Sequence, residues 1–220
     1  YLTHMENLGL VKDIDWVEYQ IKVPSESDPR IDKLSQRVLE RNEFVLVTYD
    51  DRKVLYEEAF EAFKIIDIAF SKLYGTVPLT NDVIKKAIND YIPLVNLDYI
   101  ASIKNKDGKI IAFGVLVPSI AKALKKSNGK LFPFGIFKML KALKGKNDTL
   151  EMFLVAVDPS LQAQGIPALI INALLKILAE NGVKYCETGP MLETNTKIHS
   201  LWRHFDKERH KRRRCFIKQI

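Results

Sequence analysis

The chain has 220 residues, of which 47% are hydrophobic and 28% are charged. This composition supplies a hydrophobic core and excludes intrinsic disorder, and no apolar stretch approaches the ~18–20 residues that cross a bilayer. Two cysteines, Cys186 and Cys215, are too few for a disulfide framework and lie in no C-x-x-C pair. We therefore expect a cytoplasmic protein without a structural metal site. Because no secretory leader precedes the body and the first residue is Tyr1, we also expect part of a longer protein.

The formal net charge of +7 is concentrated in two segments. Residues 118–147 contain eight lysines and no acidic residue, and residues 203–220 carry eight lysines or arginines against two acidic residues. The rest of the chain therefore has a net charge of −7. We expect an acidic body with two basic segments, which does not favour a uniformly basic nucleic-acid-binding protein.

The first half of the chain alternates strand and helix patterns. Apolar periodicity predicts a strand at 16–23, helices at 31–41, 56–74 and 80–92, a strand at 44–49, and strands at 99–103 and 109–117. The last two strands flank Asn-Lys-Asp-Gly, which is the strongest hairpin signal in the chain. Gly75 is expected to end the long helix, and Thr80 to cap the helix that follows it.

The second half contains the elements that matter for function. Two helices are expected within 118–147, followed by a strand at 151–157, a helix at 167–180, a strand at 183–187, a helix capped by Asn195 and a last strand at 215–218. The strand at 151–157 is almost wholly apolar, so we expect both of its faces to be buried. The helix at 167–180 has one narrow polar stripe and must be covered on most sides. Residues 207–214 are expected to form a solvated loop.

The junction between the strand at 151–157 and the helix after it is the most informative region. Gly165 allows a tight turn, and the start of a helix leaves backbone N–H groups without partners. Together with the positive end of the helix dipole, these groups make an anion site suited to a pyrophosphate. The simpler alternative is that Gly165 is only a turn glycine.

The pattern from Gln162 through Gly165 resembles the acyl-CoA loop of the GNAT superfamily of N-acyltransferases. A second match lies downstream, where Asn195, Ile198 and the Leu201-Trp202 pair have the spacing of a later helix in that family. The order of elements agrees over about residues 30–220. The resemblance implies an α/β (α+β) fold, in which a mixed central sheet is flanked by helices on both sides.

The resemblance also implies a domain organisation. Residues 1–23 look like the tail of a preceding GNAT-like repeat, whose remainder is missing from this chain. Residues 24–220 would form one GNAT-like acyltransferase domain with a basic helical insertion at 118–147.

The activity implied is transfer of an acyl group from acetyl-CoA or another acyl-CoA to an amine, which attacks the thioester directly. Backbone groups of residues 154–157 would hold the pantetheine and the thioester oxygen. The cofactor-binding residues implied are Val155, Ala156, Val157, Gln162, Ala163, Gln164, Gly165, Ile166, Ala168 and Asn195. The acceptor would be a small-molecule or peptide amine, and the candidate bases are Glu187, Glu193 and His199.

Each candidate base also has an ordinary structural interpretation. His199 lies among apolar neighbours, as packing or surface histidines do, and Glu193 is close enough to Asn195 to belong to a helix cap. The sequence alone distinguishes none of the three.

Two residues depart from the family pattern. Pro167 stands where the family usually has Gly or Ala, and it removes one backbone donor from the anion site. Trp202 stands where many members have a tyrosine that is thought to protonate the leaving thiolate, and an indole cannot do this at neutral pH. The alternative function is therefore a catalytically silent GNAT-fold domain used for binding or interaction.

The basic segment 118–147 allows three interpretations. Its lysines and phenylalanines can form an amphipathic surface that contacts anionic lipid. They can form a lid that steers an anionic substrate. They can also be a solvated face whose apolar side packs on the body. The basic tail does not favour nucleic acid, because it lacks interleaved aromatic residues and a reading helix.

Overall fold

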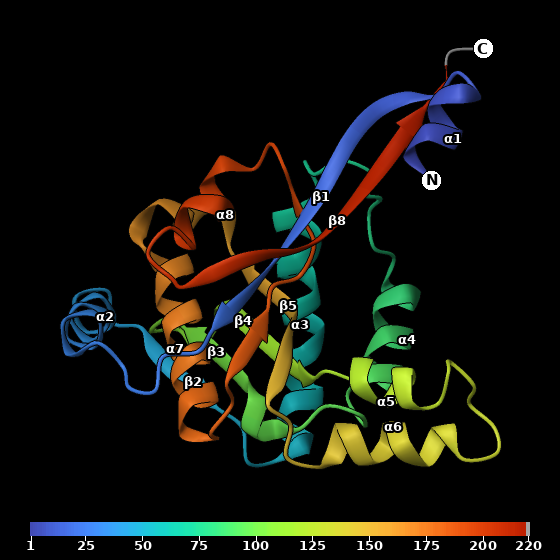
Figure 1. Cartoon of the computed structure of the whole chain (residues 1–220). Helices are drawn as coiled ribbons and strands as arrows, with labels where there is room; N and C mark the ends of the chain where they lie inside the picture. Colours follow the sequence, from blue (N-terminus) through green and yellow to red (C-terminus); the bar gives the residue numbers. More distant parts are fainter. Residues whose placement is uncertain (219–220) are drawn as a thin grey trace.

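The computed structural model describes residues 1–218 and confirms the expected mixed α/β fold (Figure 1). One eight-stranded sheet has the strand order β2-β3-β4-β5-β6-β1-β7, and β8 pairs with β1. The strands are β1 (Val11–Lys22), β2 (Val45–Thr48), β3 (Ile100–Lys104), β4 (Ile110–Pro118), β5 (Thr149–Val157), β6 (Tyr185–Glu187), β7 (Met191–Leu192) and β8 (Lys207–Ile217). The α-helices are α1 (Leu2–Asn7), α2 (Pro29–Arg41), α3 (Arg52–Phe70), α4 (Asn81–Tyr91), α5 (Ala121–Lys126), α6 (Gly135–Lys144), α7 (Ile166–Glu180) and α8 (Thr196–Leu201). Two short 3-10 helices are η1 (Leu97–Tyr99) and η2 (Pro159–Gln164).

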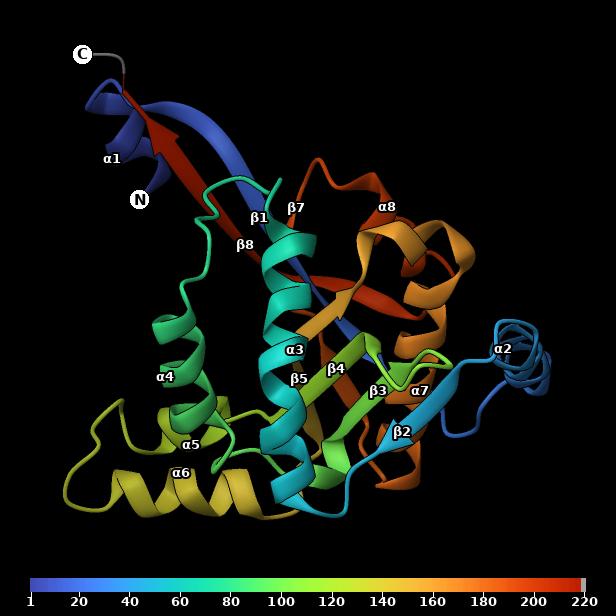
Figure 2. The same ribbon diagram turned by 180° about the vertical axis from the view of Figure 1, so that it is seen from behind.

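Helices cover both faces of the sheet (Figures 1 and 2). Successive side chains along a strand point to opposite faces, so each face contributes to its own hydrophobic core. On β4, Ala112 belongs to the core beneath α7, whereas the next residue, Phe113, belongs to a core beneath α3. Leu174 of α7 is fully buried and lies against Gly114, where a Cβ atom would collide with the leucine side chain. Gly114 therefore permits the close approach of α7 to the sheet.

Helix α7 is covered on most sides, as its single polar stripe predicts. Asn172, in that stripe, donates from Nδ2 to Oδ1 of Asp32 at 3.2 Å, and Lys176 Nζ lies 3.9 Å from Oδ2 of the same aspartate. Asp32 is on α2, so the polar stripe is where α2 joins the body.

The first and last strands of the chain form a ribbon that extends beyond the body, with α1 at its end (Figures 1 and 2). Strand β1 pairs antiparallel with β8 from Val11 to Ile21. The expectation of a solvated loop at 207–214 is therefore wrong. The basic residues of this segment lie opposite the buried acids Asp15 and Glu18 of β1, and these charge pairs hold the segment as a strand.

Other boundaries differ from the sequence-based expectations in ways that have local causes. Helix α3 begins at Arg52 because Asp51 caps it, accepting from the N–H of Lys53 at 2.8 Å. The helix ends at Phe70, so Gly75 does not follow its last turn and lies instead in a separate turn, with φ of +74°. Other expectations are confirmed, including the cap of α4, the hairpin of β3 and β4, and two helices within 118–147.

Within residues 1–218, each helix is too short or too polar to cross a bilayer.

Candidate functional site

The sheet opens between β5 and β6, and this opening creates the candidate site. Parallel pairing of the two strands runs from Thr149 to Glu151 on β5. Beyond Glu151, residues 152–157 have no strand partner on that edge within the described part of the chain. Strand β4 still pairs with β5 on the other edge, as far as Val157. The free edge therefore presents backbone N–H and C=O groups that a bound molecule can pair with.

Gly189 marks the point of separation. A Cβ atom at this position would lie 3.2 Å from the carbonyl oxygen of Met152, which is closer than side chains ordinarily approach. The chain then turns to form β7, which pairs with β1 instead of β5. The opening also exposes Phe153, whose side chain is 41% accessible. The expectation that β5 is buried on both faces is therefore wrong at residues 153–155, whereas Ala156 and Val157 are buried.

A cleft of about 370 Å³ lies along this free edge. Its walls come from β5, from the segment that carries β7, from α8 and from the end of α3. Leu154 and Val155 line one side, the polar side chains belong to Thr76, Thr188 and Asn195, and Trp202 contributes its ring. No titratable side chain is among the cleft-lining residues that the structure describes. Such an apolar slot with a few placed polar groups suits an uncharged, elongated ligand arm.

The loop after β5 leads from the cleft to the start of α7. Gly165 is the N-cap of α7 with φ of +81°, a conformation that favours glycine, and the space where a Cβ atom would lie is open. The N–H groups of the first turn have no partners within their own helix. Pro167 lies in this first turn and contributes none. The glycine turn and helix start expected here are therefore confirmed, with one N–H donor fewer, and the anion site itself stays a prediction.

The sequence-based cofactor residues of this region fall into two groups. Gln162, Ala163, Gln164, Gly165 and Ala168 are exposed along the loop and the first turn. Ile166, Ala156 and Val157 are buried, so these three can offer only backbone groups. Gln162 donates from Nε2 to the carbonyl oxygen of Val157 at 3.4 Å, which ties the loop to the end of β5.

An open groove beside this loop contains basic residues that the sequence analysis did not single out. Arg37 and Arg41 of α2 line it together with Gln164, and Glu40 also contributes to the wall. The signal available in the sequence was a pair of arginines four residues apart, which places both on one helical face. Nothing in the sequence indicated that this face lies next to the loop before α7.

Trp202 and Asn195 stand on opposite ends of α8, and both line the cleft. The side chain of Asn195 caps the helix, accepting from the N–H of Ile198 at 3.3 Å, as expected. Trp202 is buried, and its indole Nε1 has no hydrogen-bond partner among the described residues. A buried donor without a partner costs folding free energy. The atom is itself enclosed, so a ligand oxygen would satisfy it only where the groups that cover it move aside.

Glu187, one of the three candidate bases, ends β6 at the point where the sheet opens. Its side chain is buried, with Oε2 2.5 Å from Lys211 Nζ and Oε1 3.3 Å from His210 Nε2. The next residue, Thr188, lines the cleft and binds the N–H of Tyr19 through its hydroxyl oxygen at 2.9 Å. Glu187 is thus adjacent to the cleft without forming its wall.

The other two candidates are also engaged in structural contacts. Glu193 lies 2.5 Å from Lys12 Nζ, and this ion pair holds the pKa of its carboxyl below the usual range. His199 donates from Nε2 to the carbonyl oxygen of Leu192 at 3.0 Å, which leaves Nδ1 to accept from the Tyr19 hydroxyl at 3.2 Å. Neither residue lines the cleft.

Comparison with solved structures identifies the fold. The chain resembles a GCN5-related N-acetyltransferase from Sphaerobacter thermophilus, with a TM-score of 0.58 at 14% identity over 98% of this chain and 54% of that one. It also resembles a tandem GNAT protein from the clavulanic acid biosynthesis pathway, with a TM-score of 0.53 at 11% identity over 98% of this chain and 56% of that one. The chain has the GNAT fold. Identities this low establish the GNAT fold alone.

Comparison of sequences adds one relative. Protein YghO of Escherichia coli (strain K12) is 30% identical over 233 aligned positions, which include all of this chain and 57% of YghO. The chain thus spans little more than half the length of YghO and of the two GNAT structures. No protein-family model matches the sequence.

Proposed function

We propose that this protein is an acyl-CoA-dependent N-acyltransferase that transfers an acyl group to the nitrogen of a small-molecule or peptide amine. The observation that carries the proposal is the unpaired edge of β5, which borders an apolar cleft and leads directly to the N-terminus of α7. A free strand edge can pair with the amide groups of a pantetheine arm. A helix N-terminus with an adjacent glycine turn favours a pyrophosphate.

Each part of an acyl-CoA has a matching feature in this arrangement. Backbone groups of Val155, Ala156 and Val157 would pair with the pantetheine arm, and Asn195 would support it from α8. The exposed loop from Gln162 to Ala168 would hold the pyrophosphate. Arg37 and Arg41 would attract the remaining phosphate of the nucleotide, because guanidinium groups bind phosphate oxygens in a bidentate manner.

The chemistry proposed for the cleft is direct attack of the amine nitrogen on the thioester carbonyl carbon, with loss of the CoA thiolate. Backbone N–H groups at the β5 edge and the free indole N–H of Trp202 would stabilise the negative charge that develops on the carbonyl oxygen. The attacking ammonium must first lose a proton. Glu187 is the base that we propose, acting through water beside Thr188, because it directly precedes Thr188, which lines the cleft at the point where the sheet opens.

A second candidate function is a GNAT-fold domain that binds without catalysis. Two observations favour it. The described cleft wall has no titratable side chain, and Trp202 cannot supply a proton to the leaving thiolate. In this alternative, acyl-CoA or a related molecule would bind and leave unchanged.

The two functions are separated by measuring both binding and turnover. The chain is mixed with acetyl-CoA or a long-chain acyl-CoA and a panel of primary amines, while released thiol and acylated product are followed. Thiol release that depends on the amine, and that falls at least about tenfold in Glu187→Gln but not in Glu193→Gln, supports the enzyme. Saturable acyl-CoA binding without amine-dependent thiol release supports the binding domain. Absence of binding contradicts both.

A further inference from the structure

Residues 118–147 form a surface that we call the basic hairpin, made of α5, a connecting loop and α6. Large apolar side chains are exposed on it, with accessibilities of 75% for Phe132, 70% for Phe134 and 66% for Phe137. Leu131 and Leu140 are exposed on it as well. A cluster of exposed phenylalanine and leucine of this kind marks an interaction surface rather than ordinary surface variation.

Helix α6 shows how the hairpin divides its side chains. Ile136 and Met139 are partly buried on the side toward the body. The opposite face carries Phe137, Lys141 and Lys144, which are exposed and follow one another at helical spacing. The outward face therefore combines an aromatic residue with cationic ones, and the inward face is already used for packing.

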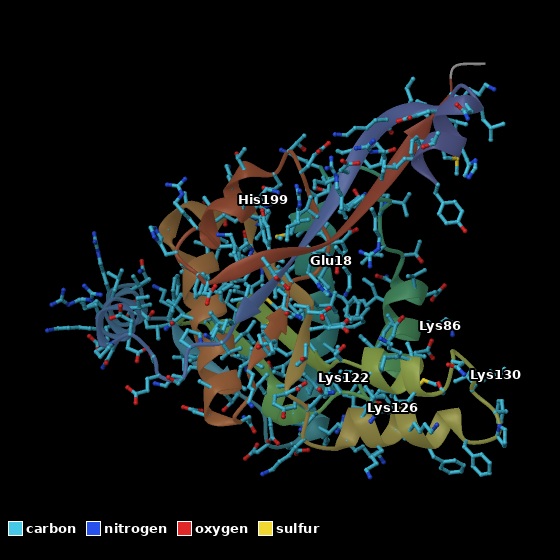
Figure 3. The ribbon with its side chains drawn as sticks, in the orientation of Figure 1. Glu18, Lys86, Lys122, Lys126, Lys130 and His199 are labelled. Atoms are coloured by element: carbon cyan, nitrogen blue, oxygen red, sulfur yellow. The ribbon has the colours of Figure 1, made fainter. Side chains whose placement is uncertain are left out.

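The charge of the hairpin is largely uncompensated. It contains eight lysines and no acidic residue. Within residues 1–218, Lys122 is the one hairpin lysine with an acidic partner, Asp148, whose Oδ2 lies 2.6 Å from Lys122 Nζ. Lys122, Lys126 and Lys130 all lie on the side of the molecule where α5 and α6 project from the sheet (Figure 3).

We propose that the basic hairpin docks on the surface of an anionic lipid bilayer. The exposed phenylalanines and leucines would enter the boundary between headgroups and acyl chains, and the lysines around them would contact lipid phosphates. The remainder of the chain has a net charge of −1, and its other basic segment, 203–220, is paired in part with the buried acids Asp15 and Glu18. The hairpin is therefore the larger uncompensated positive charge, and an anionic surface attracts it most strongly.

A lipid surface fits these observations better than a nucleic acid. Both would satisfy the lysines, but the leucines offer no stacking platform for bases, whereas they bury favourably in an acyl region. A bilayer also accepts several apolar side chains at once without a complementary pocket. The docking surface adds to the proposed acyl transfer and does not depend on it.

The test is co-sedimentation of the chain with vesicles of phosphatidylcholine alone or of phosphatidylcholine mixed with phosphatidylglycerol. Raising the salt from about 0.1 to about 1 M shortens the Debye length from about 10 to about 3 Å. The chain should bind the anionic vesicles, and the bound fraction should fall at high salt.

Two triple variants separate the apolar contribution from the charge. The first variant removes the aromatic rings and combines Phe132→Ser, Phe134→Ser and Phe137→Ser. The second removes three positive charges and combines Lys125→Gln, Lys126→Gln and Lys130→Gln. Each should weaken partitioning by at least about tenfold. Matched controls replace Ile68 and Val77 by Ser, or Lys33, Lys53 and Lys106 by Gln, all exposed and outside the hairpin. Unchanged thermal midpoints confirm that the variants fold.

Three results would overturn the proposal. Equal binding to neutral and anionic vesicles would remove the electrostatic part, and undiminished binding by both triple variants would place the contact elsewhere. Binding of a single-stranded oligonucleotide that the lysine variant loses, in the absence of vesicle binding, would assign the hairpin to polyanions.

Discussion

Arg214 donates a hydrogen bond from Nε to Oδ1 of the fully buried Asp15 at 2.8 Å, and this contact joins the last strand of the chain to the first. Arg212 reaches the other carboxylate oxygen of Asp15. The two guanidinium groups outweigh the effect of burial and hold the pKa of Asp15 well below its usual range. The β1–β8 ribbon, which joins the sheet next to β6, is therefore stabilised by this carboxylate as well as by that of Glu18.

Replacing Asp15 by Asn should lower the free energy of unfolding by about 2 kcal/mol at neutral pH, because charge-assisted hydrogen bonds from two arginines are lost. A carboxyl whose folded pKa is depressed stabilises the protein above its unfolded pKa, and that stability is lost as the pH falls through the folded pKa. The difference between wild type and Asp15→Asn in urea unfolding should therefore shrink below about pH 4. A difference that stays constant down to acid-induced unfolding would contradict this account of Asp15.

Pro167→Ala should increase affinity for CoA. The change restores a backbone N–H to the first turn of α7, next to the proposed pyrophosphate site, and a hydrogen bond to a charged group contributes about 1.5–3 kcal/mol. Isothermal titration calorimetry should therefore show a Kd at least about tenfold lower. Gly165→Ala is the opposing variant, because its φ of +81° is strained for alanine, and it should weaken binding. Unchanged affinity in both variants would place the pyrophosphate elsewhere.

Arg37→Glu and Arg41→Glu test whether the α2 groove holds a phosphate of the nucleotide. Each should raise the Kd for CoA by about tenfold, since each replaces an attraction with a repulsion. Lys53→Glu makes the same charge change at an exposed lysine of α3, outside the groove and the cleft, and should have little effect at physiological ionic strength. If all three variants weaken binding equally, the effect is one of net charge, and the groove does not contact CoA.

Trp202→Phe separates packing from hydrogen bonding in the cleft. The phenyl ring retains much of the buried apolar volume and eliminates the unpaired Nε1 donor, so thermal stability should change little. Acyl-CoA binding or turnover should nevertheless fall by about tenfold if the indole N–H bonds to the thioester oxygen. Trp202→Ala, by contrast, should cost about 3–5 kcal/mol of stability through the cavity that it leaves. Unaltered binding and turnover in Trp202→Phe would remove the indole from the proposed mechanism.

The sequence predicted the parts of the site that depend on local chemistry. Gly165 occupies a left-handed backbone conformation that glycine adopts easily, and Asn195 caps a helix by bonding to the N–H three residues further along the chain. Both features can therefore be predicted from short stretches of sequence. The order of strands and helices was predictable for the same reason, because each element has its own periodicity.

The features that the sequence did not predict depend on contacts between distant segments. The segment from Lys207 to Arg214 is polar, and its sequence alone predicts a loop. It forms a strand because β1 places Asp15 and Glu18 opposite its basic residues. Arg37 and Arg41 have the pattern of ordinary exposed residues in the sequence. Their place in a groove follows from the packing of α2 beside Gln164, which the sequence does not indicate. The unpaired edge of β5 is a property of the sheet: the residues of the strand are equally compatible with a closed sheet, and only the family resemblance indicated that backbone groups of residues 154–157 would be free.

Thermal unfolding with and without acyl-CoA tests the central claim most directly. A ligand at 100 times its Kd raises the free energy of unfolding by about 2.7 kcal/mol. We predict that acetyl-CoA or a long-chain acyl-CoA raises the midpoint of the wild type and raises that of Gly165→Ala less. No shift with either ligand at millimolar concentration, in a chain that unfolds cooperatively, would contradict the assignment of the β5 cleft as an acyl-CoA site.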